Sequence, residues 1–189
     1  VDECELLGIE ITDLPEDLTA TFEEMKKDGT LPTFATNVNP IDLTGSVTSE
    51  MFEKSVVILF NHPQVHGVIL IGLHHAPAVR EDFVDRVHGV WKKHRKPLVF
   101  CDIGETEMAR DLRRRFEKLG VPAYPSPERA AAAMAGLVQY GVFLRDQGCL
   151  EAYLDKRWPK PTAKGRGPSP QLGAGGRWRR VPPPSGDRC

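Results

Sequence analysis

The 189-residue sequence has no apolar run approaching the roughly 20 residues that span a bilayer, and its N-terminus lacks the charged-then-apolar pattern of a secretory signal. It also has no CxxC pair and no metal-ligand spacing, because its four cysteines are far apart: Cys4, Cys101, Cys149 and Cys189. We therefore expect a soluble, cytoplasmic protein with reduced cysteines. Cys101 lies in an apolar segment, where a small buried hydrophobe is expected rather than a reactive thiol.

The sequence contains no Gly-rich phosphate-binding loop and no internal repeat. We therefore do not expect a nucleotide site in which a Gly-rich loop binds the phosphates. Hydrophobic residues make up 40% of the chain, which at this length is enough for one domain with a substantial core.

Charge is distributed unevenly. Residues 1–158 contain 18 Lys+Arg and 25 Asp+Glu, a balance of −7, and residues 159–189 contain 7 basic and 1 acidic residue, a balance of +6, which together give the formal net charge of −1. An acidic body is a poor nucleic-acid binder, and we expect neither a nucleic-acid nor a membrane partner. The last 31 residues include seven prolines and six glycines. This composition predicts a domain at 1–157 followed by a disordered Pro/Gly/Arg-rich tail at 158–189.

Apolar runs alternate with amphipathic helical patterns along the first 150 residues. Four runs are typical of strands: 9–12, 68–73, 97–102 and 123–124. Residues favoured at helix ends separate them, with glycine after a helix and a hydroxyl residue before one: Gly8, Thr48, Gly120 and Ser126. Strands that alternate with helices pair in parallel through right-handed crossovers, so the sequence predicts an α/β fold, a three-layer sandwich.

In sheets of this kind, ligands bind beyond the carboxyl ends of the strands. This rule selects three loops as one candidate surface, at 39–45, 74–78 and 102–106. In the third loop, Asp102 with Glu105 and Glu107 offers a general base or a Mg²⁺ ligand, although acidic residues there more often complement the dipole of the next helix. We favour the helix-dipole explanation.

The first of these loops, Asn39 to Gly45, is rich in turn-forming residues. Pro40 restricts Asn39 to an extended conformation, Asp42 and Thr44 can accept hydrogen bonds from nearby N–H groups, and Gly45 permits a positive φ. Two interpretations are open: these residues organise a turn and the helix that follows it, or the loop amides and the helix N-terminus face an anion.

Three motifs occur in an order that resembles one enzyme family: the 39–45 loop, the apolar run 66–73 and the segment 126–130. They are similar to the second flavodoxin-like domain of the nucleotide-diphosphate-forming acyl-CoA synthetases, the superfamily of acetate-CoA ligase (ADP-forming) and succinyl-CoA synthetase. The resemblance covers about residues 1–150. It implies a flavodoxin-like parallel sheet that here lacks its first, central strand, which in the family precedes the helix ending near Leu7.

The resemblance also implies an activity for the complete enzyme: carboxylate, CoA and ATP give acyl-CoA, ADP and phosphate through an acyl phosphate and a phosphohistidine. In the family, the phosphorylated histidine and the CoA site belong to earlier domains, and an ATP-grasp domain binds the nucleotide. We therefore expect these domains as partners, in the same chain or in another subunit. CoA, ATP/ADP and Mg²⁺ are cofactors of the complete enzyme, with none assigned to this fragment.

By the same resemblance, this fragment contributes one wall of the phosphoryl-transfer and acyl site and no catalytic residue. The candidate positioning residues are Asn39, Asp42, Thr44, Gly45, His74 and His75, and no metal site is expected. The two histidines stand where succinyl-CoA synthetase has paired glycines. This departure leaves the substrate class open. The alternative to a positioning role is that His74 and His75 are merely two half-exposed residues at the end of a strand.

Two other functions are compatible with the sequence. A non-catalytic flavodoxin-like module for subunit contact or small-ligand binding fits the acidic body and the missing phosphate loop equally well. A flavin protein has only the fold in its favour. Without the central strand, neighbouring strands lose ladder hydrogen bonds, and we expect the chain to be marginally stable and inactive by itself.

Overall fold

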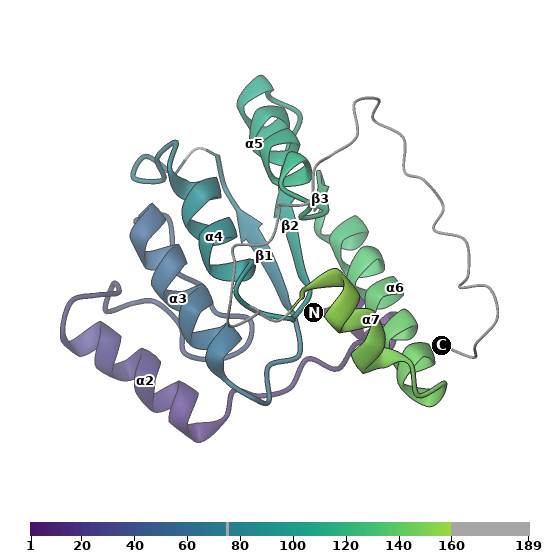
Figure 1. Ribbon diagram of the computed structural model, residues 1–189. Helices are drawn as coiled ribbons and strands as arrows, with labels where there is room; N and C mark the ends of the chain where they lie inside the picture. The colour runs from purple at the N-terminus through teal and green to yellow at the C-terminus, as the bar shows by residue number, and fades with distance from the viewer. Residues whose placement is uncertain (75, 160–189) are drawn as a thin grey trace, which may run out of the picture. The chain divides into compact units, whose positions relative to one another are not determined.

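Three parallel strands form the sheet of this protein, in the order β1, β2, β3 (Figure 1). The computed structural model describes residues 1–74 and 76–159. β1 comprises Val68–Gly72, β2 Leu98–Asp102 and β3 Ala123–Tyr124. The register pairs Val68 with Leu98 and Gly72 with Asp102, so β1 and β2 end at the same edge of the sheet. The predicted α/β class and parallel sheet are confirmed, with a flavodoxin-like arrangement of strands and helices.

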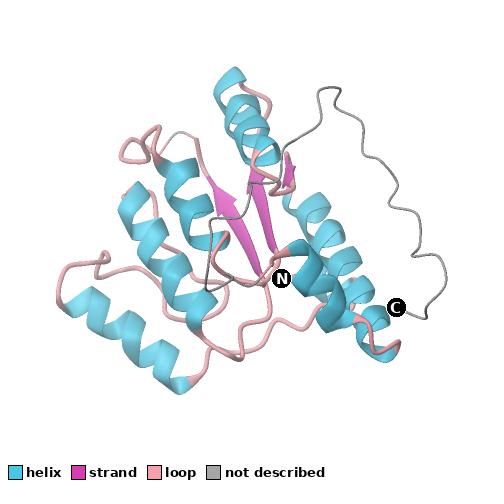
Figure 2. Cartoon of the chain, in the orientation of Figure 1, coloured by secondary structure: helices cyan, strands magenta, loops and turns pink. Residues whose placement is uncertain are grey.

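Helices surround the strands (Figure 2). The four residues predicted at helix ends, Gly8, Thr48, Gly120 and Ser126, lie next to the ends of α1, α3, α5 and α6. Their bounds are α1 Asp2–Leu6, α2 Glu16–Lys27, α3 Ser49–Asn61, α4 Phe83–Trp91, α5 Glu107–Lys118, α6 Pro127–Asp146 and α7 Leu150–Arg157. The Thr48 side chain accepts a hydrogen bond from the Met51 N–H and caps α3. Gly8 and Gly120 follow their helices with φ of 75° and 84°, the conformation that glycine adopts most readily.

One face of the sheet packs against α3, α4 and α5 through an aromatic core. Phe100 of β2 lies 4.2 Å from Phe116 of α5 and 6.0 Å from Phe83 of α4, measured between ring centroids. Phe52 of α3 extends the cluster, 5.0 Å from Phe83. Each of these rings buries a large apolar area, and tilted ring pairs at these distances stabilise the fold beyond that burial. This cluster fixes β2 as the most buried strand, since all five of its residues are inaccessible to solvent.

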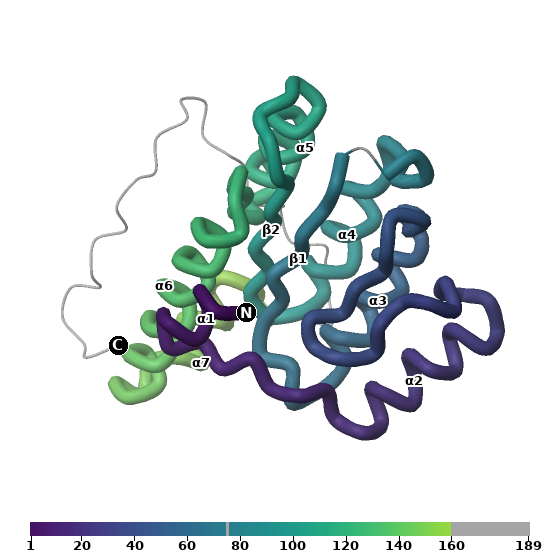
Figure 3. Tube along the Cα trace, turned by 180° about the vertical axis from the view of Figure 1, so that it is seen from behind, coloured from purple at the N-terminus to yellow at the C-terminus, as the bar shows by residue number. Residues whose placement is uncertain are grey.

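The opposite face is covered by α1 and the first part of α6, seen from behind in Figure 3. Val99 and Cys101 of β2 pack there against Ala130 and Met134 of α6, with Ile9 and Ile69 partly buried at the margin. Cys101 is fully buried, as the sequence predicts. Burial, with a smaller contribution from the adjacent Asp102 charge, raises the pKa of the Cys101 thiol to about 11, which makes it a poor nucleophile at neutral pH.

The predicted strand at 9–12 is wrong. These residues are extended coil outside the sheet, and β1 is the strand at that side of the described sheet. The physical reason is the lack of a ladder partner, because an isolated extended segment gains no inter-strand hydrogen bonds. The segment is held instead by packing of Ile9 and by the Asn39 side-chain amide, which donates to the Thr12 carbonyl at 3.0 Å.

The chain divides into two compact units, Val1–Val138 and Gln139–Cys189. The second unit contains the end of α6 and α7, a helix that the sequence pattern did not predict. Within it, Tyr140 lies 5.5 Å from Tyr153 in an edge-on arrangement and 6.4 Å from Phe143, between ring centroids. The division at 157 and the disordered tail stay predictions, since residues 160–189 lie outside the described part.

Among the described helices, none combines the length and the apolar character needed to cross a membrane.

Gly72 at the end of β1 is expected to tolerate no larger residue. A Cβ atom there would lie 2.9 Å from Cε2 and 3.1 Å from Cζ of Phe100, whose ring is locked in the aromatic core. Gly72→Ala should therefore lower the free energy of unfolding by about 1–3 kcal/mol in urea titrations. Gly89→Ala is the matched control, because that position in α4 has open space and alanine favours helix. Equal stability of the two variants would contradict the packing described here.

Candidate functional site

A cavity of about 1380 Å³ runs along β1 and reaches the residues that follow β1 and β2. The 39–45 loop lines it together with Leu73, Ala76 and Ile103, which follow the two strands. Four of the predicted positioning residues, Asn39, Asp42, Thr44 and Gly45, thus share one cavity wall. The cavity belongs entirely to the first unit of the chain.

Hydrogen bonds within the 39–45 loop fix its shape. Asp42 Oδ1 accepts from the Thr44 N–H at 2.7 Å, and the Asp42 N–H donates to Thr36 Oγ1 at 2.7 Å. The Thr36 N–H in turn donates to the Asp42 carbonyl at 3.0 Å. The turn-organising interpretation of Asp42 is therefore confirmed. The anion-binding interpretation stays a prediction.

Gly45, which permits a positive φ, does not adopt one; Thr44 does, with φ of 70°. A β-branched residue is strained in this conformation by about 1–3 kcal/mol. Two contacts hold Thr44 there: its N–H bond to Asp42, and its hydroxyl, which lies 3.1 Å from Ser46 Oγ. Strained backbone of this kind is concentrated at binding sites, which is consistent with a functional loop.

The cavity lining carries negative charge. Six acidic residues contribute to it, and none of the described lining residues is lysine or arginine; the six are Asp2, Glu3, Glu10, Asp13, Asp42 and Glu128. Phosphate groups are usually held by cationic side chains or by N–H groups at helix N-termini. This lining by itself therefore does not suit CoA or a nucleotide.

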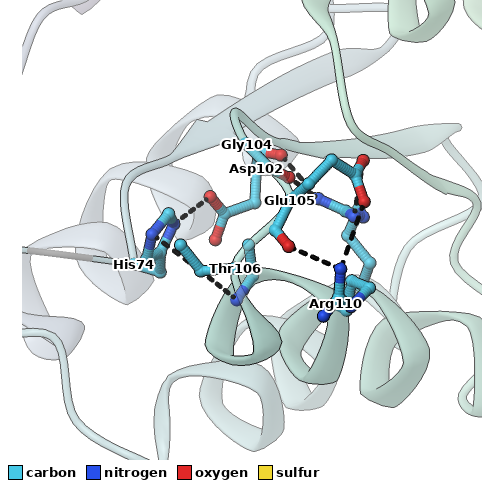
Figure 4. Close-up of polar contacts among 8 residues, drawn as sticks. His74, Asp102, Gly104, Glu105, Thr106 and Arg110 are labelled. Atoms are coloured by element: carbon cyan, nitrogen blue, oxygen red, sulfur yellow. Dashed lines mark hydrogen bonds and ion pairs between the residues drawn. The ribbon is translucent and has the colours of Figure 1, made fainter.

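His74 is not among the residues that line this cavity. Figure 4 shows its contacts with Asp102 and Thr106. Its Nδ1 is 2.7 Å from Oδ1 of Asp102, and the two side chains are 4% and 0% exposed. Its Nε2 lies 3.0 Å from the hydroxyl of Thr106, which also caps α5 by accepting from the Ala109 N–H. His74 is thus a buried link between the ends of β1 and β2, not the half-exposed residue of the sequence alternative. His75 lies outside the described residues.

Arg113 of α5 fastens the 102–106 loop from the other side. Its guanidinium donates to the carbonyls of Asp102 and Gly104 at 3.0 and 2.7 Å and contacts the Glu105 carboxylate at 3.2 Å. Asp102 therefore serves this network rather than the helix dipole, and Glu107 is the acidic residue in the first turn of α5. The sequence-based prediction did not include Arg113. Its helical spacing could have indicated that it is buried, because Ala109, Arg113 and Phe116 lie on the same buried face of α5.

Asp102 Oδ2 has no hydrogen-bond partner among the described residues, although it is buried. The described residues also contain no group of three or more side chains suited to hold a metal ion. The site is accordingly a shaped, acidic cavity whose rim is fixed by buried polar contacts.

The geometry defines a flavodoxin-like α/β module with its candidate site at the strand ends. Residues 1–142 match the model of the Ligase-CoA domain, and the chain belongs to this family.

Similar curated proteins include the alpha subunits of acetate-CoA ligases (ADP-forming) I and II of Pyrococcus furiosus. The first is 28% identical over 141 residues, covering 71% of this chain and 30% of the relative. The second is 30% identical over 148 residues, covering 73% and 30%. The chain thus spans under a third of the length of these relatives.

The fold is also similar to a solved structure. It is the dinucleotide-forming acetyl-coenzyme A synthetase 1 of Ca. Korarchaeum cryptofilum, determined in complex with phosphate and ADP. The TM-score is 0.64 with 24% identity, and the match covers 81% of this chain and 32% of that chain.

Relief of backbone strain at Thr44 should stabilise the protein. Thr44→Asn keeps the N–H that bonds Asp42 and accepts a positive φ more readily, so the free energy of unfolding should rise by about 1 kcal/mol in urea titrations. Ser46→Ala is the control, since it removes the same hydroxyl contact without relieving φ. A loss of stability in Thr44→Asn would show that the threonine conformation is not strained.

The buried link between His74 and Asp102 should dominate the stability of the site. His74→Leu leaves the buried Asp102 carboxyl without its 2.7 Å partner and should lower the free energy of unfolding by about 3–5 kcal/mol. The double variant His74→Leu/Asp102→Leu should recover most of this loss, because both polar groups are then replaced. Additive losses in the double-mutant cycle would contradict a direct interaction.

Proposed function

We propose that this chain forms one wall of the acyl- and phosphate-handling site of a nucleotide-diphosphate-forming acyl-CoA synthetase. The complete enzyme would convert a carboxylate, CoA and ATP into acyl-CoA, ADP and phosphate, through an acyl phosphate and a phosphohistidine. The observation that carries the proposal is the Ligase-CoA match over residues 1–142, which includes every described loop around the cavity. The named relatives are acetate-CoA ligases, and the acyl substrate proposed here is a small carboxylate.

In this proposal the 39–45 loop acts through its shape. The Asp42 carboxylate holds the Thr44 N–H, and Asn39 ties the loop to Thr12, so a ligand would meet a wall of fixed outline. A substrate misplaced by about 1 Å can react about 100-fold more slowly. His74 serves as a positioning residue that holds the end of β1 against Asp102. His75 stays a proposed positioning residue.

The partners would supply the cationic and catalytic groups. The acidic lining does not suit phosphate, and the described residues offer no cluster of metal ligands, so we derive no step through CoA, ATP or Mg²⁺ on this chain. A CoA-binding and phosphohistidine domain and an ATP-grasp domain, in the same chain or in another subunit, would face the cavity from outside. Its negative lining would then complement their basic groups.

A second candidate function is a non-catalytic module for subunit contact or small-ligand binding. The observation that favours it is the same acidic cavity, whose described lining lacks lysine and arginine. The two functions differ in one respect: only the ligase wall requires the shape of the 39–45 loop for turnover.

A chimaeric enzyme tests the ligase assignment. The acetate-CoA ligase (ADP-forming) I of Archaeoglobus fulgidus is 27% identical to this chain over 140 residues, and that region would be replaced by residues 1–142. Acetate- and CoA-dependent ADP formation should be retained. In this background, Asp42→Ala should lower kcat/KM for acetate about 10-fold or more, because the bond that shapes the loop is lost. Asp42→Asn keeps the acceptor oxygen and should stay within about threefold.

The matched control is Glu5→Gln, which changes one exposed acidic residue outside the cavity lining. All variants would first be compared by circular dichroism and thermal melting. A folded, active chimaera whose kcat/KM is the same with Asp42→Ala as with Glu5→Gln would exclude the loop from the site. The contact-module function would then be favoured.

A further inference from the structure

Three side chains from the ends of β1 and β2 and the start of α5 form a continuous series of hydrogen bonds. Asp102 Oδ1 lies 2.7 Å from Nδ1 of His74, and Nε2 of the same imidazole lies 3.0 Å from the hydroxyl of Thr106 (Figure 4). None of the three lines the cavity described above. A carboxylate, an imidazole and a hydroxyl in this order and at these distances are the arrangement that activates a nucleophile for acyl transfer.

The positions of the protons follow from what each group can donate and accept. An ionised carboxylate only accepts, so Nδ1 of His74 carries the proton that is shared with Asp102, and Nε2 of the neutral imidazole is an acceptor. Thr106 Oγ1 accepts from the Ala109 N–H at 3.2 Å, which leaves its own O–H to donate to Nε2. The hydroxyl proton is therefore directed at the base that would remove it.

Burial gives the three groups different access to solvent. The side chains of His74 and Asp102 are 4% and 0% exposed, whereas Thr106 is an exposed residue. A positive charge that His74 gains with the hydroxyl proton would lie against the buried carboxylate of Asp102, which stabilises it. A substrate in solution can thus reach the hydroxyl, while the base and the group that orients it stay shielded from water.

Thr106 lies at a turn from a strand into a helix. It is the N-cap of the 12-residue helix α5, which follows β2 through a loop where Gly104 has φ of 119°. For a nucleophile on a strand–turn–helix, the N–H of the next residue contributes to the site that stabilises the oxyanion. Here Glu107 and Met108 have their N–H groups in the first turn of α5, where a helix has no acceptor of its own for them.

The surroundings of Thr106 favour a neutral, aliphatic substrate. Glu105 and Glu107 adjoin Thr106 in the chain, and Arg110 and Arg113 are both engaged by the Glu105 carboxylate. An anionic substrate is therefore disfavoured. Three large apolar side chains next to these residues in the sequence are exposed and available to an acyl chain: Leu73, Ile103 and Met108.

We propose that Thr106 is a nucleophile for hydrolysis of neutral esters of short aliphatic acids, with His74 as its general base and Asp102 as the group that orients His74. Thr106 Oγ1 attacks the carbonyl carbon while its proton moves to His74 Nε2. The ester C–O bond then breaks, and the leaving oxygen takes this proton. Water attacks the acyl-threonine and gives a proton to Nε2, which returns it to Oγ1 as the carboxylic acid leaves. This activity goes beyond the proposed function and does not depend on CoA ligation.

Hydrolysis of para-nitrophenyl butyrate by the full 189-residue chain tests the proposal. Release of para-nitrophenolate should be saturable. Thr106→Val should lower kcat/KM about 100-fold or more, because the hydroxyl that exchanges a proton with His74 is lost. Thr106→Ser keeps a hydroxyl for both hydrogen bonds and should stay within about 10-fold. The hemisuccinate ester, which carries a carboxylate, should react about 10-fold more slowly than the butyrate.

Thr48→Val is the matched control. Thr48 caps α3 as Thr106 caps α5, by accepting from the N–H three residues further on, but it belongs to a different helix from the hydrogen-bonded series. Loss of this cap should cost similar stability and leave kcat/KM within about twofold. Circular dichroism and thermal melting of every variant separate lost activity from lost folding.

A fluorophosphonate probe adds a measurement that a purely structural role of the network would not change. The activated hydroxyl should displace fluoride and retain a phosphonate ester, which mass spectrometry of proteolytic peptides would locate at Thr106. His74→Gln can still hydrogen-bond to Asp102 but cannot act as a base, so labelling should be about 100-fold slower.

Three outcomes would overturn the proposal: a folded chain that neither hydrolyses the ester nor reacts with the probe, equal kcat/KM of Thr106→Val and Thr48→Val, or probe adducts at other residues only. The network would then serve only to join the ends of β1 and β2 to α5. None of these measurements involves acetate, CoA or nucleotide. Their failure is therefore distinguishable from failure of the ligase assignment.

Discussion

Backbone hydrogen bonding along β1 is the constraint on which the rest of this structure depends. A strand in a parallel sheet is stabilised by ladder bonds on both sides, and here the described sheet supplies them on one side alone. Residues 9–12 consequently remain outside the sheet, Ile71 remains exposed, and a large cavity follows the edge. All three lie along the side of β1 that pairs with no strand among the described residues.

The other side of the sheet provides the rigidity that the site requires. β2 is fully buried, and its ring Phe100 packs against Phe116 and Phe83 from two helices. Asp102 ends this strand, so its position is fixed by the core. Its side-chain carboxyl binds His74, and its backbone carbonyl accepts a hydrogen bond from Arg113. The rim of the cavity is therefore ordered from the core outward, while the other side of β1 pairs with no strand among the described residues.

Local chemistry explains which features the sequence predicts. Thr48, Gly8 and Gly120 act on residues within a few positions of themselves, and all three were predicted correctly. The segment 9–12 failed because a strand requires a distant partner. The contact of His74 with Asp102 joins residues 28 positions apart and depends on the register of Gly72 with Asp102, which no local pattern contains. Thr44, and not Gly45, has the positive φ, because hydrogen bonds to Asp42 and Ser46 hold Thr44 in that conformation.

This site has a fixed shape, but its described lining has no lysine or arginine to bind phosphate. This difference affects how such a domain can serve an enzyme. A wall that bound phosphate tightly through its own cations would retain product. In the proposed enzyme, an acidic wall such as this one would hold phosphate only while a basic partner surface faced it. Assembly of the site would then coincide with docking of the partner, so that binding energy between polypeptides is coupled to ligand binding. The same acidic lining that disfavours CoA or nucleotide on the isolated chain would thus restrict ligand binding to the assembled enzyme.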